Sequence, residues 1–181
     1  KDLTDLKKYI GDKTGIMAKF EKPLAIKRMD EILNYSDAAM VARGDLGVEM
    51  PPEEVPIIQK RIVQACRDHG KPVVVATQML DSMVNSPSPT RAEASDVATA
   101  VFDAADCLML SAETASGKFP VDSVKIMDRI IRGVESDISY RQILESKKIK
   151  LEETTSDAIS AAASQVVKTV FAKAIFTYTR S

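Results

Sequence analysis

Short apolar runs alternate with longer amphipathic stretches along most of the chain. Four runs are almost wholly apolar, and each is followed by polar residues; they cover residues 16–20, 37–42, 72–77 and 106–111. Runs this short and this continuously apolar are typical of strands that are covered on both faces, as in parallel sheets. We therefore expect four parallel strands.

The amphipathic stretches between these runs predict helices at 24–33, 53–67, 90–102 and 121–134. The third begins with Thr90 and has Glu93 three residues later, which is the pattern of a capping box. A strand followed by a helix, four times over, predicts a repeated βα architecture. A barrel and a doubly wound sheet would both provide it.

The C-terminal part of the chain has a different pattern. Residues 136–157 form a charged stretch that we interpret as a linker region. An alanine-rich segment at 157–173 predicts a helix, and the apolar residues at 174–179 predict one further strand. We expect a second domain to begin here.

Composition narrows the class of protein. Of the 181 residues 45% are apolar and 28% charged, which is ordinary for a folded domain. The 25 basic and 26 acidic residues give a net charge of −1, which argues against binding nucleic acid or a membrane surface in bulk. No apolar run approaches the roughly 20 residues of a membrane helix. We expect a cytoplasmic protein without nucleic-acid or membrane partners.

The two cysteines, Cys66 and Cys107, are far apart in a chain with one histidine, so they form neither a zinc-binding pattern nor a disulfide framework. Both have apolar neighbours. We expect both to be small buried side chains, and a chain of this kind fits a reducing compartment.

Charged and hydroxyl side chains follow three of the expected strands, at the ends where βα proteins place their active sites. Lys19 and Glu21 alternate along the first strand and so share a face. Asp45 follows the second strand, and Thr77 ends the third. Two carboxylates on successive strand ends can hold one Mg²⁺, and a lysine beside them suits an anionic group.

Simpler explanations exist for each residue. A lysine and a glutamate near a strand end often form only a surface ion pair, and Gly44 can be an ordinary turn residue. The placement of all these residues at consecutive strand ends favours an active site.

Five segments in a fixed order resemble the pyruvate kinase family. They are 17–21 (MAKFE), 40–49 (MVARGDLGVE), 76–83 (ATQMLDSM), 89–93 (PTRAE) and 109–114 (MLSAET). The resemblance covers nearly the whole chain. It implies a (β/α)8 TIM-barrel enzyme that transfers a phosphoryl group from phosphoenolpyruvate to ADP, giving pyruvate and ATP, with help from Mg²⁺ (or Mn²⁺) and K⁺.

The resemblance also implies roles for individual residues. Lys19 matches the lysine that stabilises the phosphoryl group in transfer, and Glu21 and Asp45 match the divalent-metal ligands. Thr77 matches a hydroxyl near the step of proton transfer. The turn that matches the substrate-carboxylate site consists of Ala42, Arg43, Gly44 and Asp45.

The chain departs from the family pattern in places. Ser116 stands where many members have a lysine near the nucleotide phosphates, which puts that contact in doubt. A complete barrel takes about 250 residues, so we expect a partial barrel at 1–140, a linker at 141–156 and the start of an α/β C-terminal domain at 157–181. The potassium ligands of the family fall outside the chain, and the family resemblance suggests a homotetramer.

Two alternatives remain open at this point. Another Mg²⁺-dependent barrel that acts on pyruvate or its enol, an aldolase or a lyase, would also hold its metal with a glutamate and an aspartate. A half-barrel without catalytic activity is the second. A fragment of 181 residues is expected to be incomplete for activity, and its unpaired strand edges would favour association.

Overall fold

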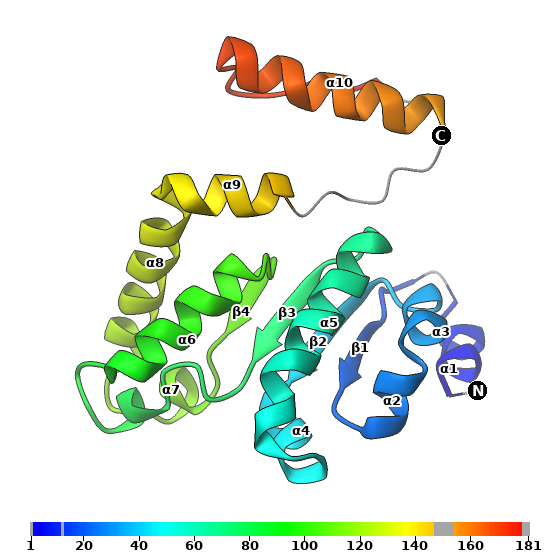
Figure 1. Cartoon of the computed structure of the whole chain (residues 1–181). Coiled ribbons are helices and arrows are strands. Elements are labelled where there is room, and N and C mark those ends of the chain that lie inside the picture. Colours follow the sequence, from blue (N-terminus) through cyan, green and yellow to red (C-terminus); the bar gives the residue numbers. More distant parts are fainter. Residues whose placement is uncertain (1, 12, 147–153, 179–181) are drawn as a thin grey trace. The chain divides into compact units, whose positions relative to one another are not determined.

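The computed structural model describes residues 2–11, 13–146 and 154–178, and these divide into two units, Lys1–Lys147 and Lys148–Ser181. The first unit contains a sheet of four parallel strands in the order β1-β2-β3-β4 (Figure 1). Their bounds are Met17–Phe20, Ala38–Ala42, Val73–Ala76 and Cys107–Met109. The expected α/β architecture with a parallel sheet is confirmed.

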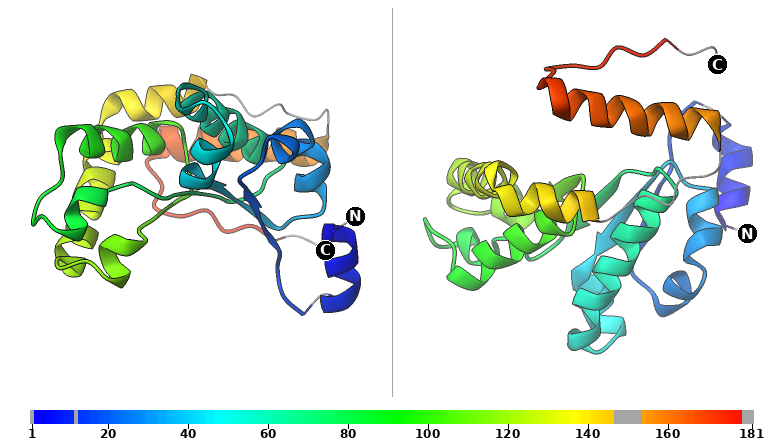
Figure 2. Two further views of the ribbon diagram at one scale, coloured as in Figure 1. Left: turned by 90° about the horizontal axis from the view of Figure 1, so that it is seen from below. Right: turned by 45° about the horizontal axis from the view of Figure 1, so that its top comes forward.

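The register of the strands gives the sheet two different faces. Phe20, Val41 and Val75 lie in one row across the sheet and are fully buried. In the preceding row, Lys19 pairs with Met40, and these side chains are exposed and partly exposed. Viewed from below, the sheet carries α5 (Val55–Asp68, teal) and α6 (Arg91–Phe102, green) on one side (Figure 2, left). In the described residues, the sheet is therefore packed on one face and open on the other.

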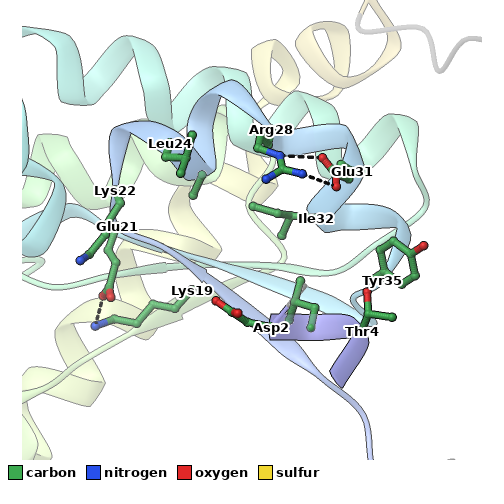
Figure 3. A pocket seen from close by; sticks show the side chains of 12 residues that line it. Asp2, Thr4, Lys19, Glu21, Lys22, Leu24, Arg28, Glu31, Ile32 and Tyr35 are labelled. Atoms are coloured by element: carbon green, nitrogen blue, oxygen red, sulfur yellow. Dashed lines mark hydrogen bonds and ion pairs between the residues drawn. The ribbon is translucent and has the colours of Figure 1, made fainter. Parts of the chain in front are cut away.

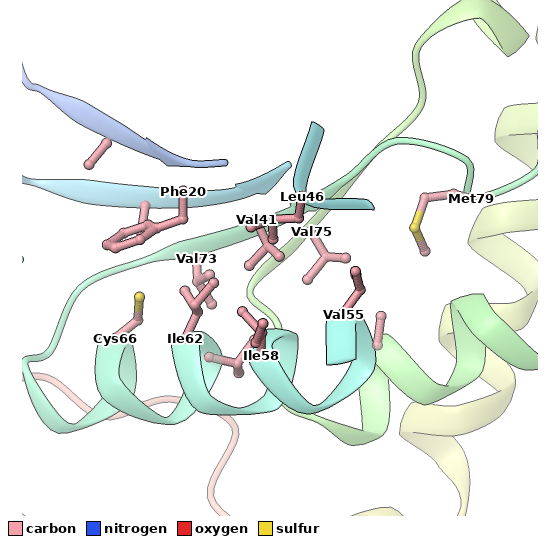
Figure 4. Close-up of a cluster of buried hydrophobic side chains, with 14 of the residues drawn as sticks. Phe20, Val41, Leu46, Val55, Ile58, Ile62, Cys66, Val73, Val75 and Met79 are labelled. Carbon is pink, nitrogen blue, oxygen red and sulfur yellow. The ribbon is translucent and has the colours of Figure 1, made fainter. Parts of the chain in front are cut away.

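The core lies between the packed face and α5 (Val55–Asp68). Ile58, Ile62 and Cys66 recur along one side of this helix and are at most 3% exposed. They pack against Phe20 and the valines of the strands (Figure 4). Burial of such aliphatic side chains contributes about 1.5–3 kcal/mol each, so this layer fixes the sheet on which the strand ends are arranged.

Cys107 corrects one expectation. Cys66 is buried as predicted, but Cys107 is exposed. Its partner in the register, Val74, belongs to the open face, and β4 is the last strand of the sheet. Apolar neighbours in the sequence did not distinguish a face that is covered from one that is not.

The remaining helices follow the predicted pattern with some differences. The helix expected at 24–33 is divided at Arg28 into α2 and α3, and the residues after β2 form α4, which was expected only as a turn. The capping box is present, since the Glu93 amide donates to Thr90 Oγ1 at 3.2 Å and the Thr90 amide donates to Glu93 Oε2 at 2.7 Å. The helices of this unit besides α5 are α1 (Asp2–Ile10), α2 (Pro23–Lys27), α3 (Met29–Asn34), α4 (Arg43–Glu49), α6 (Arg91–Phe102), α7 (Ala112–Ala115), α8 (Pro120–Ser136) and α9 (Ile138–Ser146), with 3₁₀ turns η1 (Pro52–Glu54) and η2 (Asp81–Val84). Helix α9 lies within the charged stretch, whose residues 147–153 are outside the described part.

The second unit contains α10 (Thr155–Val170), which begins at a Thr154 cap that accepts a hydrogen bond from the Asp157 amide at 3.2 Å. The expected strand is wrong for 174–178, which form no strand, and Thr179 lies outside the described residues. A strand needs the backbone of a neighbour for its hydrogen bonds, and the described residues of this unit provide none. Among the helices described in either unit, none has the length and apolarity that crossing a membrane requires.

Candidate functional site

Three predicted site residues meet at the carboxyl ends of β1 and β2. Lys19 lies in β1, Glu21 follows that strand directly, and Asp45 lies in the first turn of α4 after β2. The Lys19 ammonium is 2.6 Å from Glu21 Oε2 (Figure 3) and 2.7 Å from Asp45 Oδ2. Adjacent parallel strands end at the same edge, so the sheet itself brings these groups together.

The Lys19 ammonium interacts with both carboxylates of this cluster. Hydrogen bonds to Asp45 and then to Glu21 raise the pKa of Lys19 to about 12. The same lysine lowers the pKa of the Asp45 carboxyl. All three side chains are between 35% and 53% exposed, so solvent screens these interactions. At neutral pH the cluster contains two carboxylates and one ammonium, a net negative charge that favours a further cation.

The two carboxylates fit a shared divalent cation. One oxygen from each lies within hydrogen-bonding distance of the same nitrogen, so both carboxylates face the position that the Lys19 ammonium holds. Oxygen donors suit Mg²⁺ and Mn²⁺, and Mg²⁺ is commonly held by one or two carboxylates with water and substrate oxygens as its other ligands. In the described residues no three or more His, Cys, Asp or Glu side chains are grouped so that they could hold a metal ion.

A second contact joins the turn after β2 to the turn after β3. The Gly44 amide donates to Thr77 Oγ1 at 2.7 Å, and the same hydroxyl donates to the Ala76 carbonyl at 2.6 Å. A Cβ atom on Gly44 would lie only 3.3 Å from Thr77 Oγ1, so the glycine allows this close approach. Ala42, which ends β2, is fully buried. Gly44 and the adjacent Asp45 both lie in the first turn of α4.

The turn after β3 has an unusual backbone. Thr77 and Gln78 have φ values of 71° and 53°, a conformation that costs a non-glycine residue about 1–3 kcal/mol. The Arg43 side chain is bound here, with Nη2 donating to the Thr77 carbonyl at 2.8 Å. Its Nη1 donates to Asp96 Oδ1 at 2.7 Å. The family resemblance implied a role for the turn that contains Arg43, but none for the Arg43 side chain. No sequence pattern indicated a role for Asp96.

Two further glutamates hold the same turn farther along. Glu113 is 2% exposed and accepts hydrogen bonds from the Leu80 amide at 3.1 Å and the Ser111 amide at 2.8 Å. Glu93 accepts from the amide and the hydroxyl of Ser82 at 2.7 and 2.6 Å. Both glutamates belong to segments that resemble the pyruvate kinase family, 89–93 and 109–114. Their contacts show that they bind the backbone of this turn.

A pocket of about 320 Å³ lies beside the cluster (Figure 3). Residues of α1, β1, α2 and α3 line it, and Lys19 and Glu21 are among them. Arg28 also lines it but is paired with Glu31 through two hydrogen bonds of 2.6 and 2.7 Å. Asp45 and Thr77 do not line this pocket, so the candidate site is the exposed edge of the sheet rather than the pocket.

Comparison with known proteins gives a consistent result. The family model of the pyruvate kinase barrel domain matches residues 1–124. The chain is 54% identical over 180 residues to a pyruvate kinase of Methylorubrum extorquens, covering 99% of this chain and 38% of that protein. It is 51% identical over 181 residues to one of Agrobacterium vitis, covering 100% of this chain and 38% of that protein. It is 49% identical over 171 residues to one of Sporosarcina psychrophila, covering 94% of this chain and 29% of that protein.

The chain thus spans well under half the length of these relatives, and the match includes the strands and turns that form the edge described above. The family model covers more than half of the chain, from α1 to the first turn of α8. The chain belongs to the pyruvate kinase family.

Proposed function

We propose that this chain is part of the catalytic barrel of a pyruvate kinase, an enzyme that transfers a phosphoryl group from phosphoenolpyruvate to ADP to give pyruvate and ATP. The observation that supports this most directly is the convergence of Glu21 and Asp45 on Lys19 at one end of a parallel sheet. Phosphoryl transfer depends mainly on positioning and charge neutralisation, and this cluster supplies both signs of charge.

Each residue has a proposed role. The Lys19 ammonium stabilises negative charge on the phosphoryl group in transfer. Glu21 and Asp45 hold Mg²⁺ or Mn²⁺, which when bound neutralises substrate oxygens. The backbone from Ala42 to Asp45, with the Gly44 amide, binds the substrate carboxylate. Thr77 is a hydroxyl near the step of proton transfer.

Using the Gly44 amide for substrate has a structural consequence. That amide is bonded to Thr77 Oγ1 in this structure. A carboxylate that takes this amide replaces the bond and leaves the Thr77 hydroxyl free to accept from another donor. Substrate binding and the orientation of Thr77 are therefore coupled.

The larger assembly is also a proposal. We assign residues 1–140 to part of a (β/α)8 barrel, 141–156 to a linker and 157–181 to the start of a C-terminal α/β domain. The potassium ion of the reaction would have its ligands outside this chain. A cytoplasmic homotetramer in glycolysis is the proposed setting.

The test is ADP-dependent formation of pyruvate from phosphoenolpyruvate, measured on the full-length protein. Lys19→Met is expected to lower turnover by orders of magnitude while Mn²⁺ binding persists. Lys125→Met, which removes an exposed lysine from α8, is the matched control and should retain full turnover. Absence of ADP phosphorylation in the unaltered protein would reject the function, and unchanged turnover of Lys19→Met would reject the role of Lys19.

A further inference from the structure

The turn after β3 holds a strained backbone next to the residue that the proposed reaction needs. Thr77 and Gln78 both have positive φ values, although neither is a glycine. Strained backbone of this kind persists only where surrounding contacts fix it, and it is frequent at functional sites. The contacts that fix it therefore determine where the Thr77 hydroxyl lies.

Arg43 makes the contacts at the strained residues. Its Nη2 and Nε donate to the Thr77 carbonyl at 2.8 and 3.3 Å, and Nη2 also lies 3.3 Å from the Gln78 carbonyl. Both carbonyls belong to the residues with positive φ. A planar guanidinium can donate these bonds from Nε and Nη2 while Nη1 stays available for another acceptor. A lysine ammonium does not have this planar arrangement of donors.

Asp96 binds the remaining nitrogen of the guanidinium, Arg43 Nη1. It lies in α6, 53 residues farther along the chain, and its Oδ1 accepts from Arg43 Nη1 at 2.7 Å. The Arg43 side chain is only 12% exposed and that of Asp96 is 37% exposed. A charge-assisted hydrogen bond is stronger than one between neutral groups, and this one limits the rotamers that the largely buried Arg43 side chain can adopt.

Farther along, the turn is held independently of Arg43. Glu113 binds the Leu80 amide and Glu93 binds Ser82. Loss of Asp96 should therefore loosen the turn at Thr77 and Gln78 without releasing its far end. A local effect of this kind can be measured separately from unfolding.

We propose that Asp96 is a positioning residue: acting through Arg43, it holds the Thr77–Gln78 turn so that the Thr77 hydroxyl and the Gly44 amide keep their relative positions. The role in turnover rests on the proposed function, whereas the role in fixing the turn does not. Asp96 touches neither Thr77 nor Gly44 in the hydrogen bonds of the described residues, so its effect passes through Arg43.

The test compares Asp96→Asn, Asp96→Glu and Arg43→Lys with the unaltered full-length protein. Asp96→Asn keeps the shape and removes the charge, and Asp128→Asn is the matched control, because Asp128 forms an exposed pair with Arg132 in α8. The readouts are kcat and KM for phosphoenolpyruvate, Mn²⁺ affinity, and hydrogen exchange of the backbone over 77–84 without substrate.

For Asp96→Asn and Arg43→Lys we expect kcat to fall about tenfold to a hundredfold, since a misplacement of about 1 Å can cost about a hundredfold. Mn²⁺ affinity should stay close to that of the unaltered protein, whereas the thermal midpoint should fall, because the pairing of the largely buried Arg43 with a charged Asp96 is lost or weakened. Exchange should accelerate at Gln78 and Met79 but not in α8. Asp96→Glu should recover part of kcat, and Asp128→Asn should change none of these quantities.

Two results would overturn the proposal: unaltered exchange at 77–80 in Asp96→Asn, or a fall in kcat accompanied by faster exchange throughout the barrel, which indicates a general loss of stability. If the unaltered protein forms no pyruvate, the proposed function fails. The exchange measurement still decides whether Asp96 fixes the turn.

Discussion

At the scale of single residues, the chemistry of the site follows from spacing in the strands. Lys19 and Glu21 were predicted together because alternate residues of a strand share a face, and Asp45 because it follows the neighbouring strand. The ion pairs of 2.6 and 2.7 Å agree with that expectation. The roles of these residues in binding metal and phosphoryl groups stay predictions.

The contact between Arg43 and Asp96 could not be predicted in this way. The two residues are 53 positions apart, so no local pattern connects them. The positive φ of Thr77 could not be predicted from the sequence either. The usual sequence signals for that conformation are glycine and asparagine, and a β-branched residue such as threonine rarely adopts it. Long-range contacts impose this backbone.

The first prediction concerns Glu21. Glu21→Gln keeps the shape of the side chain and removes one of the two charges that face the proposed cation. We expect the Mn²⁺ dissociation constant of the full-length protein to rise at least about tenfold, measured by calorimetry or electron paramagnetic resonance. Glu31→Gln, which alters a carboxylate paired with Arg28 in the neighbouring pocket, is the control. An unaltered Mn²⁺ titration of Glu21→Gln would remove Glu21 from the metal site.

The second prediction concerns the two thiols. Burial, with a smaller effect from the charge of Asp106, raises the pKa of Cys66 to about 12, whereas Cys107 is exposed. Because the thiolate is the reactive form, a disulfide reagent at pH 8 should label one thiol of the monomeric 181-residue chain, in which the open face of the sheet is uncovered, and Cys107→Ser should abolish this labelling. Rapid labelling of Cys66 in the folded chain would contradict the packing of α5 on the sheet.

The same shift predicts a pH dependence of stability. In the unfolded chain Cys66 ionises with a pKa of about 8.5, but in the folded chain it stays protonated up to a pKa of about 12. Between these values the folded state binds more protons, so the free energy of unfolding contributed by Cys66 falls as pH rises. Cys66→Ala should reduce that alkaline slope in urea titrations, and an unchanged slope would contradict the shift.

At the scale of elements, the four strands predicted for the first unit and most helices are confirmed because their apolar residues recur in clear patterns. Helix α4 was not predicted, because only Leu46 among its seven residues is buried and the sequence therefore has no helical pattern of apolar residues there. The strand expected at 174–178 shows the opposite case. Its apolar composition favours a strand, but pairing depends on a neighbour that the described residues of that unit do not contain.

Two glycines provide a further prediction. A Cβ atom at Gly117 would lie 2.6 Å from the Glu113 carbonyl oxygen, immediately after α7. Backbone must shift to admit it, so Gly117→Ala is expected to destabilise the chain by about 1–3 kcal/mol. It should also disturb Glu113, whose carboxylate holds the Leu80 amide.

Gly133 is the matched control. It lies in α8, is exposed, and a Cβ atom added there would meet nothing within 4 Å among the described residues. Because alanine favours a helix by about 0.8–1.0 kcal/mol over glycine, Gly133→Ala should stabilise the protein. Urea unfolding of both variants measures the difference, and equal stabilities would show that the turn after α7 is looser than described.

At the scale of the whole molecule, the sheet of the first unit has two open edges in the described residues. β1 and β4 each have one strand neighbour in the described residues, and their outer edges carry unpaired backbone groups. The open face adds apolar side chains, among them the exposed Met17 and the partly exposed Met40 and Val74. Unpaired edges and apolar faces of this kind promote association with other chains.

The last prediction follows for the 181-residue chain expressed by itself. It should sediment as a species well above 19.8 kDa or precipitate, and it should form no pyruvate, because a complete barrel takes about 250 residues and the proposed K⁺ ligands lie outside this chain. Val74→Lys places a charge on the open face and should shift the distribution toward the monomer. Val48→Lys, at an exposed position in α4 outside the sheet, should not. A monomer that converts phosphoenolpyruvate would show that four strands suffice for both folding and catalysis.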